Sequence, residues 1–274
     1  MEPVLKWAGG KRKLLSSIKN YINREVIEGH TLYEPFIGGG SLSFDLEYPN
    51  TVINDFNQEI TNVYEQIKNN PEQLIDLLRI HQVNHCDEYY YQIRNLDRSP
   101  IYQEMDLVSK AARVIYLNKT CYNGLYRVNS RGYYNVPVGR YVNPDIVMEN
   151  RIRAMHEYLF NNDITILTGD FEQSLHDVQP GDFVYFDPPY DYETSGFTSY
   201  VMNGFSREDL TRLRNVCDQL IANGVHVLIS NNDTQFVNDL FGFDHYHIEH
   251  IEASRFINCD GKKRNKVKEV LIYG

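Results

Sequence analysis

Residues 183–190 read Phe-Val-Tyr-Phe-Asp-Pro-Pro-Tyr, and this stretch decides the fold. The apolar run 183–186 predicts a short buried strand. A carboxylate, two prolines and an aromatic ring therefore follow the carboxyl end of that strand, where open α/β sheets bind their ligands. Asp187 and a stiff proline carbonyl can each accept a hydrogen bond from an amine, and Tyr190 can stack on a planar ring. A proline-rich turn that only ends a strand is the alternative interpretation.

Short β-prone runs recur on both sides of this stretch. They occupy residues 31–36, 51–55, 163–167 and 225–230, and the runs 245–252 and 267–273 are expected to pair antiparallel at a sheet edge. Helix-period segments lie between several of these runs. One opens with the capping pattern of Ser206 and Asp209 and is predicted to run to Ala222. This alternation predicts an α/β fold with a mostly parallel, doubly wound, Rossmann-like sheet.

The interval from about residue 57 to about residue 164 interrupts the alternation. It is predicted to be helical from Gln58 to His81 and again from about Met105 to Lys119, with a β-hairpin around residues 130–132. We interpret it as an inserted, mainly helical domain. The predicted division is residues 1–58 and 148–274 for one domain and residues 59–147 for the other.

The composition is that of a globular chain without a membrane segment. It has 274 residues, 42% of them hydrophobic, and no apolar run approaches the roughly 18 residues of a membrane span. The first residues lack the layout of a signal peptide. The four cysteines are widely spaced, which argues against a zinc site or a disulfide framework. We therefore expect a cytoplasmic protein with reduced thiols and no metal.

The formal net charge of −10 speaks against a nucleic-acid partner, but the charge distribution does not. No Asp or Glu occurs from Leu107 to Pro144, and a second basic cluster occupies residues 255–268. Positive surfaces on a negative body can hold a phosphate backbone. Solvated basic surfaces without a ligand are the alternative. The basic residues of the first stretch are Lys110, Arg113, Lys119, Arg127, Arg131 and Arg140.

Three further features are candidates for a cofactor site. The segment 34–40 is a strand end followed by a glycine-rich turn, in which Gly38 allows close approach of a ligand; a plain tight turn is equally consistent. Asp55 ends the next strand, where an acidic residue can hold ribose hydroxyls or simply cap a helix. Trp7 precedes two glycines and Lys11. It can cover a bound cofactor or anchor the core.

Taken together, these residues resemble the DNA adenine-N6 methyltransferases of the Dam type, the GATC-methylating enzymes. Each motif alone is common, but six in the family's order are highly specific, and they span nearly the whole chain. Their arrangement resembles that of the α group of amino-methyltransferases. The matching segments are 6–11, 34–40, 54–57, 122–127, 135–141 and 187–190.

The resemblance implies S-adenosylmethionine as the cofactor and double-stranded DNA as the partner. The residues that match the family's cofactor contacts are Trp7, Lys11, Phe36, Gly38, Asp55, Asp170, Phe171 and Asp187. Those that match its DNA contacts are Lys6, Tyr122, Asn123, Leu125, Arg127, Pro137 and Arg140. The catalytic residues implied are Asp187, Pro188 and Tyr190. Arg127 would suit a bidentate contact to a guanine edge.

The implied mechanism is direct methyl transfer to an adenine flipped out of the duplex. Rival interpretations are the same chemistry on cytosine N4, an RNA adenine or a protein amide, or a non-catalytic sequence-specific DNA-binding protein. Cytosine-N4 enzymes usually begin the tetrapeptide with Ser and glutamine enzymes with Asn, whereas this chain has Asp. The exact recognition sequence and a housekeeping, restriction-modification or phage role stay open. We expect a monomer without an obligate protein partner.

Overall fold

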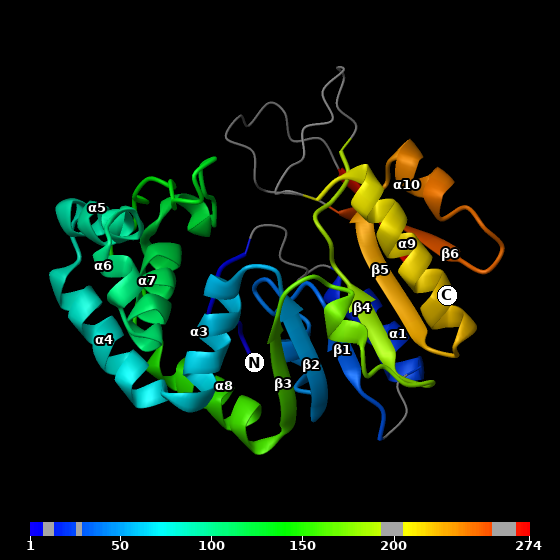
Figure 1. Ribbon diagram of the computed structural model, residues 1–274, viewed down its shortest axis with the longest axis horizontal. Helices are drawn as coiled ribbons and strands as arrows, with labels where there is room; N and C mark the ends of the chain where they lie inside the picture. Colours follow the sequence, from blue (N-terminus) through cyan, green and yellow to red (C-terminus); the bar gives the residue numbers. More distant parts are fainter. Residues whose placement is uncertain (8–13, 26–28, 193–204, 254–266) are drawn as a thin grey trace. The chain divides into compact units, whose positions relative to one another are not determined.

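The computed structural model describes residues 1–7, 14–25, 29–192, 205–253 and 267–274 (Figure 1). The chain forms two compact units. Unit 1 comprises Met1–Lys11 and Ile37–Asp170, and unit 2 comprises Arg12–Phe36 and Phe171–Gly274. Each unit combines parallel strands with helices, which confirms the predicted α/β class with a mostly parallel, Rossmann-like arrangement of strands. The predicted functional division at residues 59–147 stays a prediction.

Unit 1 is built on two parallel strands, β2 (Asn50–Asp55) and β3 (Asp163–Thr168). Their register pairs Asp55 with Thr168, so the two carboxyl ends lie side by side. Both strands lie where the sequence predicted them. The helices of this unit are α2 (Ser43–Leu46), α3 (Gln58–Asn69), α4 (Pro71–Asn84), α5 (Asp87–Asn95), α6 (Ile101–Glu104), α7 (Leu107–Thr120) and α8 (Glu149–Asn161).

The stretch predicted to be helical from Gln58 to His81 is helical except at Asn70, where a break before Pro71 divides it into two helices. Helix α3 ends at Asn69, and α4 begins at Pro71. Proline has no N–H to donate and disfavours a helical conformation in the residue before it. Asn70 accordingly has φ −136° and ψ 45°, which is not helical.

The predicted hairpin around residues 130–132 is confirmed as a tight turn. Val128 and Tyr134 form an antiparallel bridge, and the N–H of Asn129 donates to the carbonyl of Tyr133 over 2.9 Å. Gly132 has φ +79°, a conformation that side-chain-bearing residues avoid. The turn therefore presents residues 130–132 at its tip.

Helix α7 is the central helix of unit 1, with α3, α4 and α5 packed against it (Figure 1). All its residues from Ala111 to Thr120 are buried. A helix buried on all sides must pair its polar side chains internally. Arg113 is one of these buried polar residues, and its contacts are described below.

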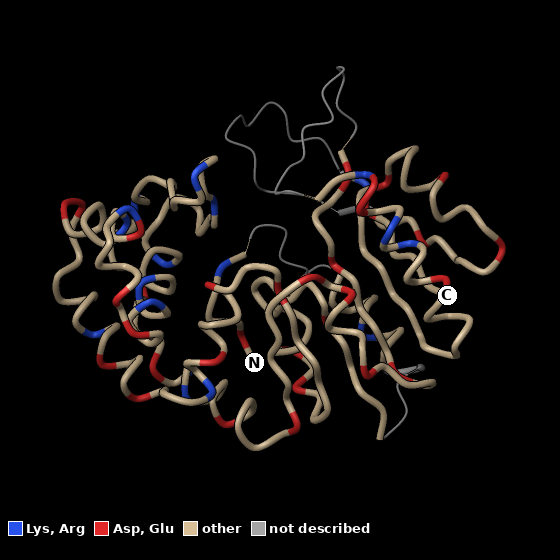
Figure 2. The backbone as a smooth tube through the Cα atoms, viewed as in Figure 1, with Lys and Arg blue, Asp and Glu red and all other residues tan. Residues whose placement is uncertain are grey.

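Two basic residues of the acid-free stretch are buried, which corrects the prediction that all six form a positive surface. Arg113 is 1% exposed and Lys119 is 5% exposed, because both lie on α7. Burial lowers the pKa of Lys119 to about 7, and the charges of Arg151 and Lys6 add to this effect. Figure 2 marks Lys and Arg in blue, and in residues 121–144, which follow α7, they occur without any Asp or Glu. The exposed cations there are Arg127, Arg131 and Arg140.

The described residues of unit 2 form five strands in the order β1-β4-β5-β7-β6. The first three are parallel, and β7 runs antiparallel to both of its neighbours, as predicted for the tail. Within the described ranges, no helix combines the length and the apolar character that a membrane span needs. The elements are α1 (Leu15–Glu25), β1 (Leu32–Glu34), β4 (Phe183–Phe186), α9 (Arg207–Ala222), β5 (His226–Asn232), α10 (Gln235–Leu240), β6 (His247–Ala253) and β7 (Val267–Tyr273).

The predicted capping box of α9 is confirmed, and it gives a stability prediction. Ser206 accepts a hydrogen bond from the N–H of Asp209, and the Asp209 carboxylate accepts one from the N–H of Ser206. We expect Ser206→Ala to lower the free energy of unfolding by about 1 kcal/mol, because the helix loses its cap. Chemical denaturation measures this loss. Thr211→Ala, at an exposed position of the same helix, is the control; an equal loss in both variants would contradict the capping role.

Candidate functional site

The glycine turn of unit 1, residues 37–40, is held against the carboxyl end of β2. The N–H of Gly38 donates to Oδ2 of Asp55 over 2.9 Å, and the N–H of Ile37 donates to the carbonyl of Asn54 over 2.8 Å. Gly38 has φ +45° and Gly40 has φ +68°, which a β-carbon disfavours. The turn therefore lies beside Asp55, as predicted. Because its glycines have no side chains, a ligand can approach its backbone.

Asp55 is not the cap of α3, which was the alternative interpretation of this residue. Asn57 is the N-cap, since its side chain accepts from the N–H of Glu59. Asp55 instead accepts from the N–H of Gly38 on one oxygen and from the N–H of Asn57, over 2.9 Å, on the other. Burial raises the pKa of Asp55, and these two N–H groups oppose the rise. Each oxygen of the Asp55 carboxylate can accept a further hydrogen bond, so the carboxylate can bind two neighbouring hydroxyl groups of a ligand.

The neighbouring strand end adds a second acidic residue. The N–H of Gly169 donates to the carbonyl of Asp55 over 3.2 Å, and the Asn54 side chain donates to the carbonyl of Gly169 over 3.0 Å. Asp170 follows immediately. The structure therefore brings Asp55 and Asp170, which are far apart in sequence, to one edge of unit 1.

Trp7 packs over the glycine turn. A β-carbon at Gly38 would lie 2.7 Å from Nε1 of Trp7, so the indole and the turn are in close contact. The other side of Trp7 stacks on Tyr126 at a centroid separation of 5.8 Å. Trp7 is half-buried rather than a fully enclosed core anchor. Lys11, predicted to act with it, lies outside the described residues.

In unit 2, Asp187 directly follows β4, as predicted from the sequence. Pro188 is buried, and Pro189 and Tyr190 are half-buried. Oδ1 of Asp187 accepts a hydrogen bond of 2.9 Å from the hydroxyl of Ser230, which lies on the neighbouring strand β5. Sequence reasoning missed Ser230. Its only signal was a polar run, residues 230–232, at the end of an apolar strand.

Asp191 anchors the other end of the loop formed by residues 187–191. Its carboxylate accepts a two-pronged contact from Arg207, at 2.9 and 3.0 Å, and a hydrogen bond from the hydroxyl of Thr234. Its backbone N–H donates to Asn231, and its carbonyl accepts from the side chain of Asn232. Paired N–H donors from one arginine fix a carboxylate in orientation as well as position. These contacts, also missed from sequence, make the loop a rigid platform.

Phe36 and Phe171 are brought together in unit 2. Their rings stack at a centroid separation of 5.4 Å, and Phe205 meets the edge of Phe36 at 5.6 Å. The guanidinium of Arg212 lies 4.7 Å from the Phe171 ring centroid. The two predicted cofactor contacts thus belong to one aromatic cluster, and Phe205 and Arg212 are additions that the sequence did not reveal.

Residues 121–141 of unit 1, called the recognition segment after their predicted role, contain all the predicted DNA contacts except Lys6. The N–H of Tyr122 donates to the carbonyl of Pro137 over 2.9 Å, which joins the two halves of the segment. The backbone of Lys6 is paired with the side chain of Asn118, and its ammonium lies over the ring of Tyr141. Leu125 is half-buried. The exposed predicted residues are Lys6, Tyr122, Asn123, Arg127, Pro137 and Arg140.

A buried polar cluster supports the recognition segment. The guanidinium of Arg113 lies 2.9 Å from the carboxylate of Asp97 and 3.5 Å from that of Glu59. Asp97 accepts from the N–H of Tyr134, and Glu59 accepts from the hydroxyl of Tyr126. Because Tyr126 and Tyr134 lie within the segment, this cluster fixes its position on the helices.

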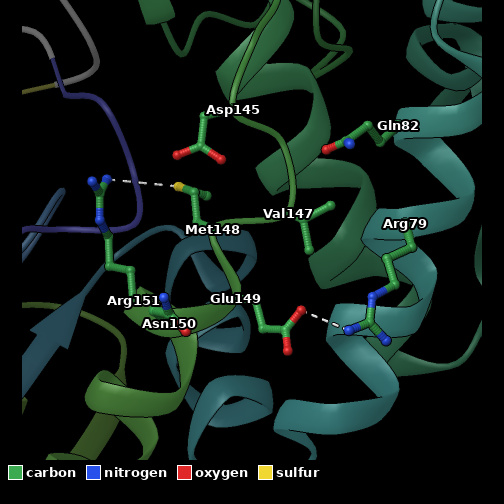
Figure 3. A pocket seen from close by; sticks show the side chains of 8 residues that line it. All are labelled: Arg79, Gln82, Asp145, Val147, Met148, Glu149, Asn150 and Arg151. Atoms are coloured by element: carbon green, nitrogen blue, oxygen red, sulfur yellow. Dashed lines mark hydrogen bonds and ion pairs between the residues drawn. The ribbon is translucent and has the colours of Figure 1, made fainter.

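A cavity of about 760 Å³ in unit 1 is lined by none of the predicted site residues (Figure 3). Its Arg79 is paired with Glu149, and its Arg151 is paired with Glu2. The cations of the cavity are therefore already neutralised, and we do not assign the site there. The residues that line it are Arg79, Gln82, Asp145, Val147, Met148, Glu149, Asn150 and Arg151.

A mostly parallel α/β fold, with an acidic residue after one strand and Asp-Pro-Pro-Tyr after another, defines a Rossmann-like amino-methyltransferase. The profile of the D12 class N6 adenine-specific DNA methyltransferases matches residues 7–257, and the chain belongs to this family. The resemblance inferred from the six motifs is thereby confirmed.

Three relatives match this chain over nearly their whole length. The chain is 46% identical over 274 residues to the type II methyltransferase M1.LlaDCHI of Lactococcus lactis subsp. cremoris, with 99% of this chain and 95% of that protein covered. It is 38% identical to the type II methyltransferase M.MjaIII of Methanocaldococcus jannaschii, with 99% and 98% covered. It is 32% identical to the DNA adenine methylase of Escherichia coli strain K12, with 97% and 93% covered.

Proposed function

We propose that this protein transfers the methyl group of S-adenosylmethionine to N6 of a flipped-out adenine in double-stranded DNA, within the sequence GATC. The observation that carries the proposal is the placement of Asp187 at the carboxyl end of β4, braced by Ser230. The family of the chain supports adenine as the base.

The residues of each unit fit parts of the proposed cofactor. Asp55 offers carboxylate oxygens with remaining acceptor capacity to the ribose hydroxyls. Gly38 and Phe36 would line the methionine end, and Asp170 and Phe171 would flank the adenine ring. Trp7, which packs against Gly38, would also contact the cofactor. Phe36 and Phe171 provide the apolar contacts. When bound, S-adenosylmethionine supplies an electrophilic methyl group.

Asp187, Pro188 and Tyr190 act on the target adenine. Its amine is a poor nucleophile, because the nitrogen lone pair is delocalised into the ring. Hydrogen bonds from the amine to the Asp187 carboxylate and the Pro188 carbonyl oppose this delocalisation and fix the direction of the lone pair. The ring of Tyr190 stacks on the base. Asp187 also contacts the cofactor in this proposal.

The recognition segment reads the DNA. Tyr122 and Asn123 lie next to the flipped base, and Lys6, Leu125 and Pro137 contact base pairs of the site. Arg140 contacts the DNA from the end of the segment. The GATC assignment rests on the resemblance of the motifs around Arg127 and Pro137 to the Dam type.

Arg127→Ala gives a test of base readout. We expect discrimination at one base pair of the site to fall by about 1–3 kcal/mol, the usual worth of a bidentate arginine contact to guanine. Transfer rates on DNA duplexes with single base-pair changes measure it. Nε of Arg127 also donates to Asn135 over 2.7 Å, so Asn135→Ala is the matched control that removes this contact and keeps the cation. Unchanged discrimination at every position in Arg127→Ala would remove Arg127 from this role.

The proposed function is tested by methylating unmethylated plasmid DNA with radiolabelled S-adenosylmethionine. The product is then digested with a pair of GATC-cleaving enzymes, of which one is blocked by N6-methyladenine and the other requires it. A switch in the digestion pattern is the expected result. Label in DNA without a switch would refute GATC. No label in DNA would instead favour RNA, cytosine N4 or a protein amide, or a silent DNA-binding protein.

We also propose the roles of the domains, the oligomeric state and the cellular location of the enzyme. Residues 59–147 serve as the target-recognition domain, and residues 1–58 and 148–274 serve as the catalytic domain. The protein acts as a monomer on cytoplasmic DNA of a bacterial or phage-infected cell. The type II methyltransferases among its relatives support a restriction-modification role.

A further inference from the structure

Two buried hydroxyl groups lie in line behind Asp187. The hydroxyls of Tyr185 and Ser230 are 2.9 Å apart, and the Ser230 hydroxyl lies 2.9 Å from Oδ1 of Asp187. The side chains of Tyr185 and Ser230 have no exposed surface. The remaining residues of β4 are apolar, so a polar pair at this place calls for an explanation beyond packing.

The strand register explains how the three side chains meet. Tyr185 and Asp187 are two residues apart, so the pleat directs both to the same face. Tyr185 pairs with Leu228 on the parallel strand β5. Ser230 lies two residues beyond Leu228 and therefore occupies that same face, next to Asp187.

The direction of the two hydrogen bonds follows from the number of protons available. In the ionised state that the proposed function requires, Asp187 can only accept, so the Ser230 hydroxyl donates to it. Ser230 then has no second proton, and the hydroxyl of Tyr185 must donate to Ser230. Burial, together with the negative charge of Asp187, raises the pKa of Tyr185 well above its ordinary value, so this hydroxyl keeps its proton. Aligned hydroxyls strengthen one another.

We propose that Tyr185 and Ser230 are positioning residues for methyl transfer, forming a hydroxyl relay that fixes the Asp187 carboxylate as the acceptor for the adenine amine. This inference rests on the proposed function, because it gives a role to the partners of its central residue. A structural pair that only satisfies two buried hydroxyls would stabilise the fold without affecting the rate of transfer.

The variants Tyr185→Phe, Ser230→Ala and their combination test the relay. Single-turnover transfer at saturating DNA and S-adenosylmethionine is expected to slow about 10–100-fold in Ser230→Ala, the worth of one hydrogen bond to a charged group. A smaller loss, about 3–10-fold, is expected in Tyr185→Phe, since its hydroxyl acts only through Ser230. The combined variant should match Ser230→Ala. Ser230→Thr, which keeps the hydroxyl, should restore most of the rate.

Tyr246→Phe is the matched control. Its hydroxyl donates to the carboxylate of Asp218 over 2.7 Å, so the same atom is deleted from a tyrosine hydrogen bond elsewhere in unit 2. It should lower the melting temperature and leave the single-turnover rate unchanged. Dissociation constants for DNA and the cofactor should stay near the wild-type values in all variants.

Three outcomes would overturn the relay. One is an unchanged rate in Ser230→Ala or Tyr185→Phe with only the melting temperature lowered. Another is a combined variant whose loss equals the product of the two single losses, which would make the hydroxyls independent. The third is the absence of methyl transfer to DNA by the wild-type protein, which is measured first and would contradict the proposed function together with the relay. Normal wild-type transfer with unaffected variants contradicts the relay alone.

Discussion

Asp187→Ala should reduce methyl transfer by about 10²–10³-fold while the protein remains folded. Preorganised polar groups in an active site are typically worth this much in rate. The carboxylate accepts a hydrogen bond from Ser230 and follows the end of β4, so its loss removes a fixed acceptor without opening the core. Transfer of labelled methyl groups to DNA measures the effect, and thermal unfolding checks the fold.

Asp177→Ala is the control for this prediction. Asp177 is an exposed carboxylate of the same unit and carries no proposed role, so its removal should leave transfer at the wild-type rate. We expect Asp187→Ala to weaken cofactor binding as well, because Asp187 is also proposed to contact the cofactor. Normal turnover in a folded Asp187→Ala protein would refute the mechanism.

The positions of the strands were predictable because local pattern determines them. The apolar run 183–186 became β4 with those bounds, and the capping box at Ser206 began α9 as expected. The helical stretch from Gln58 was also predicted, but its division into two helices at Pro71 was not, because its apolar spacing continues through the proline. Proline removes a backbone donor at that point, and a periodicity of apolar residues does not record this.

Part of the candidate site could be predicted from the sequence for one physical reason. Ligand-binding residues of parallel sheets follow strand ends, so Gly38, Asp55 and Asp187 could be chosen before their contacts were known. The structure adds that Asp55 joins the glycine turn rather than capping α3. The choice between those two roles depends on a contact across 17 residues, which no local pattern specifies.

The supporting residues could not be predicted, because their partners are distant in sequence and common in type. Ser230 lies 43 residues from Asp187, and a single serine at a strand end has no signature. Arg113 illustrates the opposite error. Its position in an acid-free stretch indicated a basic surface, whereas the helix that carries it is buried on all sides. Charge patterning in sequence cannot tell which face of a helix the fold encloses.

Arg113→Met should lower the free energy of unfolding by about 3 kcal/mol. Removing one member of a buried ion pair typically costs roughly 3–5 kcal/mol, since the opposite charge stays buried. The lower end applies here because Arg98 also pairs with Asp97, at 2.7 Å. Methionine replaces the aliphatic part of the arginine side chain, so the loss mainly reports the guanidinium. That group also donates to the carbonyls of Ile93 and Arg94, which lose a partner.

The same substitution should weaken DNA binding, because Asp97 and Glu59 hold the recognition segment through Tyr134 and Tyr126. Denaturant unfolding and DNA titration measure the two effects. Arg153→Met is the control: Arg153 pairs with Glu72 and Glu149 at the surface, where water screens the charges, so both properties should stay near the wild-type values. If the two variants lowered the free energy of unfolding equally, the burial of Arg113 would not explain its contribution to stability. A stability loss confined to Arg113→Met, with DNA affinity unchanged, would separate the cluster from recognition.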